Sequence, residues 1–194
     1  MKIISGGYVL RPLEDTELDE AAIYAIFHDW FDDGKGPYTR RRASIDLTSW
    51  VKGNSKVIRP LVDGDTLAEQ TRWIEGLLLL LDGVPIGFYE LAVKGRMVEI
   101  RTQAVLASER GKGHGSMMGR MYAHYTIELL NSSETRAKVI ESQPPVRAIL
   151  RRFGLDEGAT EIGRDTKQPL INARIDRVKW DARPAESAII TSEV

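Results

Sequence analysis

The segment that decides the fold is residues 97–115, MVEIRTQAVLASERGKGHG. Its first ten residues have the length and alternation of a β-strand, and a helical pattern begins at Ser116. Glycine occupies alternate positions in between, and it allows a sharp turn in which backbone N–H groups converge. The start of the helix adds further N–H groups. The segment therefore predicts an anion-binding cradle between a strand and a helix.

The glycine spacing excludes two other phosphate-binding motifs. No Gly-Lys-Ser/Thr sequence ends the loop, as it does in a P-loop, and Gly111, Gly113 and Gly115 do not have Gly-x-Gly-x-x-Gly spacing. Arg110 and Lys112 add positive charge. The alternative is a basic turn in which the glycines serve only flexibility.

The residues before the loop predict a three-stranded antiparallel meander. Leu77–Leu81 is an apolar run of strand length, Asp82-Gly83 is a hairpin signal, and Val84–Lys94 returns to the strand at 97–106. Further strands are predicted at 8–13, 136–141, 159–163 and 169–180, and helices at 16–29, 45–50, 65–74, 116–130 and 144–152. Residues 1–180 are expected to form one domain, followed by a flexible tail at 181–194.

Composition limits the classes of function. The net charge of −1 provides no global attraction to nucleic acid or anionic membranes. The chain has no cysteine, and its three histidines lack metal-ligand spacing, so neither a disulfide nor a metal site is expected. No apolar run reaches about 18 residues, and the first residues lack a signal peptide's apolar core. We therefore expect a cytoplasmic protein without membrane contact.

The loop resembles a known motif. Arg110-x-x-Gly113-x-Gly115 matches the Q/R-x-x-G-x-G/A motif of the GNAT N-acetyltransferase superfamily, and the meander and the following helix are similar to that family over roughly residues 8–180. The resemblance implies an α/β (α+β) fold with a mixed, mostly antiparallel sheet of six to seven strands and about four helices. It also implies an acetyltransferase that moves an acetyl group from acetyl-CoA directly to a primary amine in a ternary complex.

The resemblance also assigns cofactor contacts. The loop backbone is expected to hold the CoA pyrophosphate, and the end of the preceding strand to bind the pantetheine and thioester. A second clamp is expected at the start of the later helix, and His114 is expected to lie over the cofactor. The residues implied are Val105, Leu106, Arg110, Gly111, Lys112, Gly113, His114, Gly115, Ser116, Gln143 and Arg147.

Glu99 is the candidate general base. A period of two puts Glu99, Arg101, Gln103 and Val105 on one face of the strand. Glu99 lies eleven residues before Arg110. Histone-acetyltransferase-type members of the family carry a glutamate general base at that place on the strand, so the resemblance implies the same role for Glu99. It is expected to act directly or through water. The alternative is that Glu99 and Arg101 pair with neighbouring strands. The oxyanion donor is expected to be the N–H of Val105 or Leu106.

Two positions depart from the family. Leu150 stands where many members have a tyrosine, and Ser142-Gln143 replaces the usual asparagine. Either the thiolate leaves without a proton donor, or Tyr89, Tyr122 or Tyr125 replaces the missing tyrosine as the donor. The alternative for these three tyrosines is that they are core aromatics. A catalytically reduced acyl-CoA-binding module is therefore an alternative.

The acceptor is not identified by the sequence. The basic run Arg40, Arg41 and Arg42 would suit an acidic acceptor, the CoA 3′-phosphate, or nucleic acid that includes a modified-base amine. The alternative is that the run is a solvated surface. Trp30, Phe31 and Trp50 are expected in an acceptor pocket or in the core. Association into a homodimer is left open.

Overall fold

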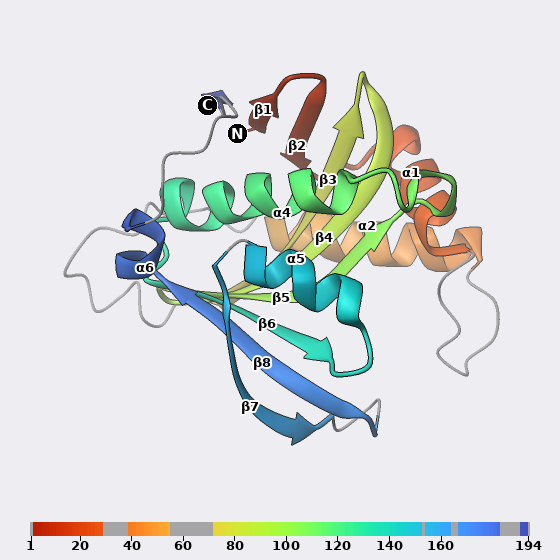
Figure 1. The fold of residues 1–194 in the computed structure, drawn as a ribbon. Coiled ribbons are helices and arrows are strands. Elements are labelled where there is room, and N and C mark those ends of the chain that lie inside the picture. The colour runs from red at the N-terminus through yellow and green to blue at the C-terminus, as the bar shows by residue number, and fades with distance from the viewer. Residues whose placement is uncertain are drawn as a thin grey trace.

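The described residues form one nine-stranded sheet with the strand order β7-β8-β6-β5-β4-β3-β2-β1-β9 (Figure 1). The computed structural model describes residues 2–28, 39–54, 72–152, 154–163, 167–182 and 191–193. The strands are β1 Lys2–Ser5, β2 Tyr8–Pro12, β3 Arg72–Leu81, β4 Val84–Lys94, β5 Met97–Val105, β6 Glu134–Ile140, β7 Asp156–Ile162, β8 Pro169–Asp176 and β9 Thr191–Glu193.

Five α-helices occur in the described ranges: α1 Glu17–His28, α2 Arg40–Asn54, α4 His114–His124, α5 Pro144–Arg152 and α6 Arg177–Asp181. A π-helical turn at Tyr125–Leu129 continues α4, and a 3₁₀ turn at Ala107–Glu109 precedes the glycine-rich loop. None of these helices has both the length and the apolar character needed to cross a bilayer.

The sheet confirms the predicted mixed, mostly antiparallel class, because every neighbouring pair is antiparallel except β5–β6. Its strand count exceeds the predicted six to seven. The two additional strands are β1 and β9, which pair with each other at one edge. Both are too short to show a period of two, so pairing between the two ends of the chain creates them. The domain limit at residue 180 and the flexibility of the tail stay predictions.

The sheet has a hydrophobic core on each face. On one face α1 and α2 pack through Phe27, Leu47 and Trp50, and the Trp50 ring lies 4.5 Å from that of Phe88. Trp50 is therefore a core residue, whereas Trp30 and Phe31 lie outside the described residues. On the other face α4 packs through apolar residues that include Met118 and Met121, and the π-helical turn adds Tyr125. Burial of two apolar faces provides the main stabilisation of the fold.

Two helix predictions and one strand prediction were wrong in places where tertiary contacts override local pattern. The helix expected only at 45–50 runs over Arg40–Asn54, and buried Ala43 extends the apolar stripe of Leu47 by one turn toward the N-terminus. Most of the helix expected at 65–74 lies outside the described residues, but its last positions belong to β3, which pairs with β4 along its full length. The strand expected at 169–180 ends as β8 at Asp176, because the Asp176 side chain caps α6 by accepting the Lys179 N–H at 2.8 Å.

The parallel pair β5–β6 separates along its length. The two strands pair only over Met97–Ile100 and Glu134–Ala137. Beyond this point β5 continues beside β4 to Val105, while β6 continues beside β8 to Ile140. This split leaves one edge of β5 without a neighbouring strand, and α4 and α5 lie across it (Figure 1).

Candidate functional site

The loop between β5 and α4 has a backbone that requires glycine at two positions. Gly111 and Gly113 have φ angles of 79° and 87°, in the left-handed region that L side chains rarely adopt. No described atom lies within 4 Å of where a Cβ would stand at either residue, so the space in front of the loop is open. The loop therefore has the turn and the room that the predicted cradle needs.

Gly115 serves packing instead. A Cβ at this position would lie 3.1 Å from the Ile149 Cδ1 atom, so the absent side chain lets α5 approach the first turn of α4. Arg152, at the end of α5, also reaches this turn, where its Nη1 lies 3.4 Å from the Ser116 Oγ. Sequence reasoning missed Arg152, because only the packing of α5 on α4 brings a basic last turn to the loop.

The two basic side chains of the loop have internal partners. Arg110 Nε donates to the Val105 carbonyl oxygen at 3.0 Å, and Lys112 Nζ donates to Glu109 Oε1 at 3.0 Å. The His114 imidazole is buried against β2, where its Nδ1 lies 2.8 Å from the Tyr8 hydroxyl. Exposed ion pairs contribute at most about 1 kcal/mol, so Lys112 is available to an anion.

The end of β5 distinguishes the two predicted oxyanion donors. Leu106 N–H donates to the Ile86 carbonyl oxygen at 2.9 Å and so belongs to the β4–β5 pair. Because successive N–H groups of a strand point to opposite sides, Val105 N–H points away from β4 and into the split. Of the two groups, Val105 N–H is the one placed for a ligand in the split.

A β-bulge changes the faces of β5. Thr102 lies opposite Glu90, but Ile100 lies opposite Leu91, so Arg101 is an extra residue. Tyr89 then faces Gln103, whereas Ala92 faces Glu99, and alternation along β4 puts these two pairs on opposite faces of the sheet. The prediction that Glu99 shares a face with Gln103 and Val105 was wrong, because a bulge shifts the alternation by one residue.

Glu99 and Arg101 both form ion pairs with β4, as the alternative interpretation predicted. Lys94 Nζ donates to Glu99 Oε2 at 3.2 Å, and Arg101 Nη1 lies 3.8 Å from Glu90 Oε1. The side chain of Lys94 is half-exposed, so this pair is weak and its carboxylate stays accessible to an amine or a water. The role of Glu99 as a base stays a prediction.

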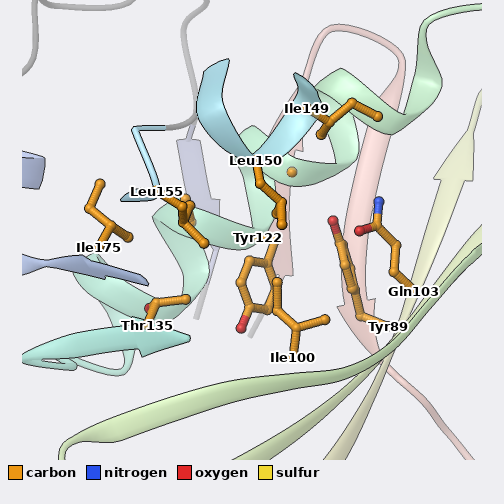
Figure 2. Close-up of a pocket in the computed structure, with 11 residues that line it drawn as sticks. Tyr89, Ile100, Gln103, Tyr122, Thr135, Ile149, Leu150, Leu155 and Ile175 are labelled. Atoms are coloured by element: carbon orange, nitrogen blue, oxygen red, sulfur yellow. The ribbon is translucent and has the colours of Figure 1, made fainter. Parts of the chain in front are cut away.

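An apolar pocket lies in the β5–β6 split beneath α4 and α5 (Figure 2). Leu150 is buried and points into the pocket toward Tyr122, and the Tyr89 hydroxyl points to the side of Gln103 (Figure 2). Tyr89 and Tyr122 lie ring to ring at 4.7 Å, and burial raises the pKa of both phenols. Both phenols stay protonated at neutral pH, and the buried Tyr122 hydroxyl has no hydrogen-bond partner among the described residues.

Tyr125 is excluded from this pocket by its partner. Its hydroxyl donates to the buried carboxylate of Glu75 on β3. Of the three tyrosines that the sequence offered in place of Leu150, Tyr89 and Tyr122 line the pocket.

Arg147 is engaged away from the loop. Its Nε and Nη2 donate to the two carboxylate oxygens of Glu157 on β7, at 3.0 and 2.8 Å. This guanidinium, with Arg151, lowers the pKa of the Glu157 carboxyl to about 2. Gln143 precedes the helix and is roughly 13 Å from Arg152 along its axis, at 1.5 Å per residue. Their contacts with a cofactor stay predictions.

The basic run at the start of α2 makes local contacts. The Arg40 guanidinium lies 4.7 Å from the centre of the Tyr24 ring, and Arg42 Nε lies 3.9 Å from Asp46 Oδ2. Contact with nucleic acid through this run stays a prediction. Among the described residues, no group of three or more His, Asp or Glu side chains is arranged to hold a metal ion.

Comparisons with known proteins give the fold its class. A probable acetyltransferase superposes with a TM-score of 0.67 at 16% identity, covering 93% of this chain and 99% of its own. A chimera of the Vibrio cholerae spermidine N-acetyltransferase SpeG and hSSAT gives 0.67 at 15% identity, covering 92% and 100%. A GNAT-family acetyltransferase from Bacillus anthracis gives 0.66 at 12% identity, covering 91% and 98%.

No protein-family model matches the chain, and a sequence search of curated proteins finds no match. Similarity at these identities establishes the fold, and that fold is the GNAT fold. The resemblance inferred from Arg110–Gly115 is therefore confirmed at the level of the three-dimensional structure.

Proposed function

We propose that this protein is an acetyl-CoA-dependent N-acetyltransferase that moves the acetyl group directly to a primary amine in a ternary complex. The observation that carries the proposal is the open glycine-rich loop, with left-handed Gly111 and Gly113, at the start of α4 and beside the β5–β6 split. The three solved structures described above, which share this fold, carry the names of acetyltransferases.

The described residues fit a CoA-type substrate. The loop leaves open space at the start of α4, where the N–H groups of a helix N-terminus would bind an anion such as a pyrophosphate. Lys112 and Arg152 add positive charge at its rim. The free edge of β5 offers alternating backbone groups to the amides of a pantetheine arm, in the manner of an added strand. The loop would thus hold the pyrophosphate, and the adjacent edge of β5 would hold the pantetheine arm.

The chemistry needs a deprotonated amine, because an alkylammonium has a pKa of about 10 and no free electron pair. Glu99 is proposed to accept this proton, directly or through water. Val105 N–H is proposed to donate to the oxyanion as the amine nitrogen bonds to the carbonyl carbon. The carbon–sulfur bond then breaks and the thiolate leaves. A cysteine acyl-enzyme is excluded, since the chain has no cysteine.

Calorimetry with acetyl-CoA tests the first half of the proposal. We expect binding in the micromolar range, and thiol release when a panel of primary amines is added. Absence of binding up to millimolar acetyl-CoA would refute the proposal. The matched control is the Gly113→Ala variant, in which the left-handed residue of the loop acquires a Cβ.

A second candidate is an acyl-CoA-binding module with little catalysis. It is favoured by Leu150, which is 5% exposed and occupies the position where a proton donor is expected. Glu99→Gln separates the two candidates. An enzyme is expected to lose at least tenfold in kcat with unchanged affinity for acetyl-CoA, whereas a binding module releases no thiol before or after the substitution.

A further inference from the structure

A buried histidine connects both ends of the glycine-rich loop to the sheet. His114 opens α4, and its Nδ1 lies 2.8 Å from the Tyr8 hydroxyl on β2. Its Nε2 lies 3.2 Å from the Oε2 atom of Glu109, the residue immediately before the loop. Only 8% of the His114 side chain is exposed. The Glu109 carboxylate can only accept, so the His114 Nε2–H donates to it, and the Tyr8 hydroxyl shares the second hydrogen bond with Nδ1.

The Glu109 carboxylate extends this network into the loop. While Oε2 receives the imidazole, Oε1 receives Lys112 Nζ at 3.0 Å. The Lys112 hydrogen bond is the main reason that the pKa of Glu109 lies below its ordinary value. One ionised carboxylate thus joins a buried residue to an ammonium group that is 55% exposed.

The loop needs such a connection. Glycine has more backbone freedom than any other residue, so Gly111 and Gly113 do not by themselves hold one conformation. The described Cβ environments of both are open, so packing does not hold them either. The side chains on either side of these glycines, Glu109 and His114, are the ones bonded to each other.

We propose that Tyr8, His114 and Glu109 form a latch that holds the glycine-rich loop in its anion-binding shape and keeps Lys112 beside it. Lys112 then exchanges Glu109 for a phosphate group of the incoming ligand, while the other three residues stay in place. Tyr8 and His114 are positioning residues, since they act through Glu109. The proposal rests on the proposed function, in which that ligand is acetyl-CoA.

Tyr8→Phe tests the latch, because it removes only the hydroxyl and keeps the ring that packs edge-on against the imidazole. We expect the Kd of acetyl-CoA to rise about fivefold, the equivalent of one hydrogen bond of about 1 kcal/mol, with kcat unchanged. Tyr24→Phe is the matched control, because Tyr24 also lies beside a histidine, His28, but on α1. An unchanged Kd in Tyr8→Phe overturns the proposal.

Acetylpantetheine separates positioning from general damage. This acyl donor lacks the phosphates that the loop would bind, so its kcat/KM is expected to be the same in the native protein and in Tyr8→Phe. An equal fall with acetylpantetheine and acetyl-CoA would mean that the substitution damages the whole fold, and would overturn the latch.

Two measurements keep the latch testable if acetyl-CoA does not bind to the native protein, a result that refutes the proposed function alone. Imidazole ¹⁵N NMR is expected to show a hydrogen on His114 Nε2 in the native protein, with the Nδ1 signal shifted in Tyr8→Phe. Inorganic pyrophosphate is expected to bind the native protein about fivefold more tightly than Tyr8→Phe. Equal pyrophosphate affinities, or an unchanged Nδ1 signal, would overturn the latch.

Discussion

Glu75 makes the stability of this protein depend on pH in a way that can be worked out from the structure. The carboxyl is fully buried on β3 beneath α4, and desolvation raises its pKa from 4.5 to about 7, although the Tyr125 hydrogen bond opposes the rise. The Trp73 indole approaches the same carboxylate, but its Nε1 does not reach hydrogen-bonding geometry. The ionised form therefore lacks the donors that a buried charge needs.

The direction of the effect follows from proton linkage. Below pH 4.5 the carboxyl is protonated in the folded and the unfolded chain, and its contribution to stability is fully present. As the pH rises to about 7, only the folded chain retains the proton, so the free energy of unfolding falls. A rise from 4.5 to about 7 corresponds to a loss of about 3 kcal/mol, most of it between pH 5 and pH 8.

Glu75→Gln removes this titration and keeps an acceptor for Tyr125. Between pH 5 and pH 8 we expect the free energy of unfolding of the variant to rise by about 2–3 kcal/mol relative to that of the native protein. The measurement is urea unfolding followed by tryptophan fluorescence. Glu17→Gln, at an exposed carboxylate of α1, is the control and is expected to show no such gain. If the free energies of unfolding of Glu75→Gln and the native protein differ by the same amount at pH 5 and at pH 8, the reasoning is refuted.

Three further predictions concern the loop and the packing of α1. Gly113→Ala is expected to weaken acetyl-CoA binding at least tenfold, because it disfavours the left-handed residue at the start of α4; Gly6→Ala, left-handed in the β1–β2 turn, is its calorimetric control and should bind normally. Arg152→Ala should raise the KM for acetyl-CoA a few fold without changing kcat, and a steady-state assay that shows the reverse contradicts its place at the rim. Asp19→Asn should lower the free energy of unfolding, measured in urea, by about 3 kcal/mol. The fully buried Asp19 carboxylate is bonded at 2.6 Å to the Arg11 guanidinium, which loses its counter-charge in the variant. A loss below about 1 kcal/mol would contradict this.

Local chemistry explains why the loop could be predicted from the sequence. The glycines of Arg110–Gly115, the preceding strand and the following helix are adjacent in the chain, and a left-handed backbone excludes most other residues. The Asp82-Gly83 hairpin and the capped helix α1 are local in the same sense, and all three were predicted at their observed places.

Pairing between distant segments decided what the sequence did not. The bulge at Arg101 exists only because β5 must match β4, and it moves Glu99 to the other face from Gln103. The Leu106 N–H donates to the Ile86 carbonyl oxygen, and the Arg147 guanidinium donates to the Glu157 carboxylate. These partners determine whether either residue can contact a ligand. A spacing in the sequence specifies an element and its face, but a side chain's partner depends on which element the fold places beside it.

The sequence by itself determined that a strand, a glycine turn and a helix succeed one another at residues 97–130, because those preferences are carried by adjacent residues. Only the tertiary structure decided that β5 and β6 separate beyond Ile100, and that Tyr8, more than a hundred residues away, bonds to His114 at the loop. Both depend on long-range packing, which puts groups in contact that no sequence periodicity relates.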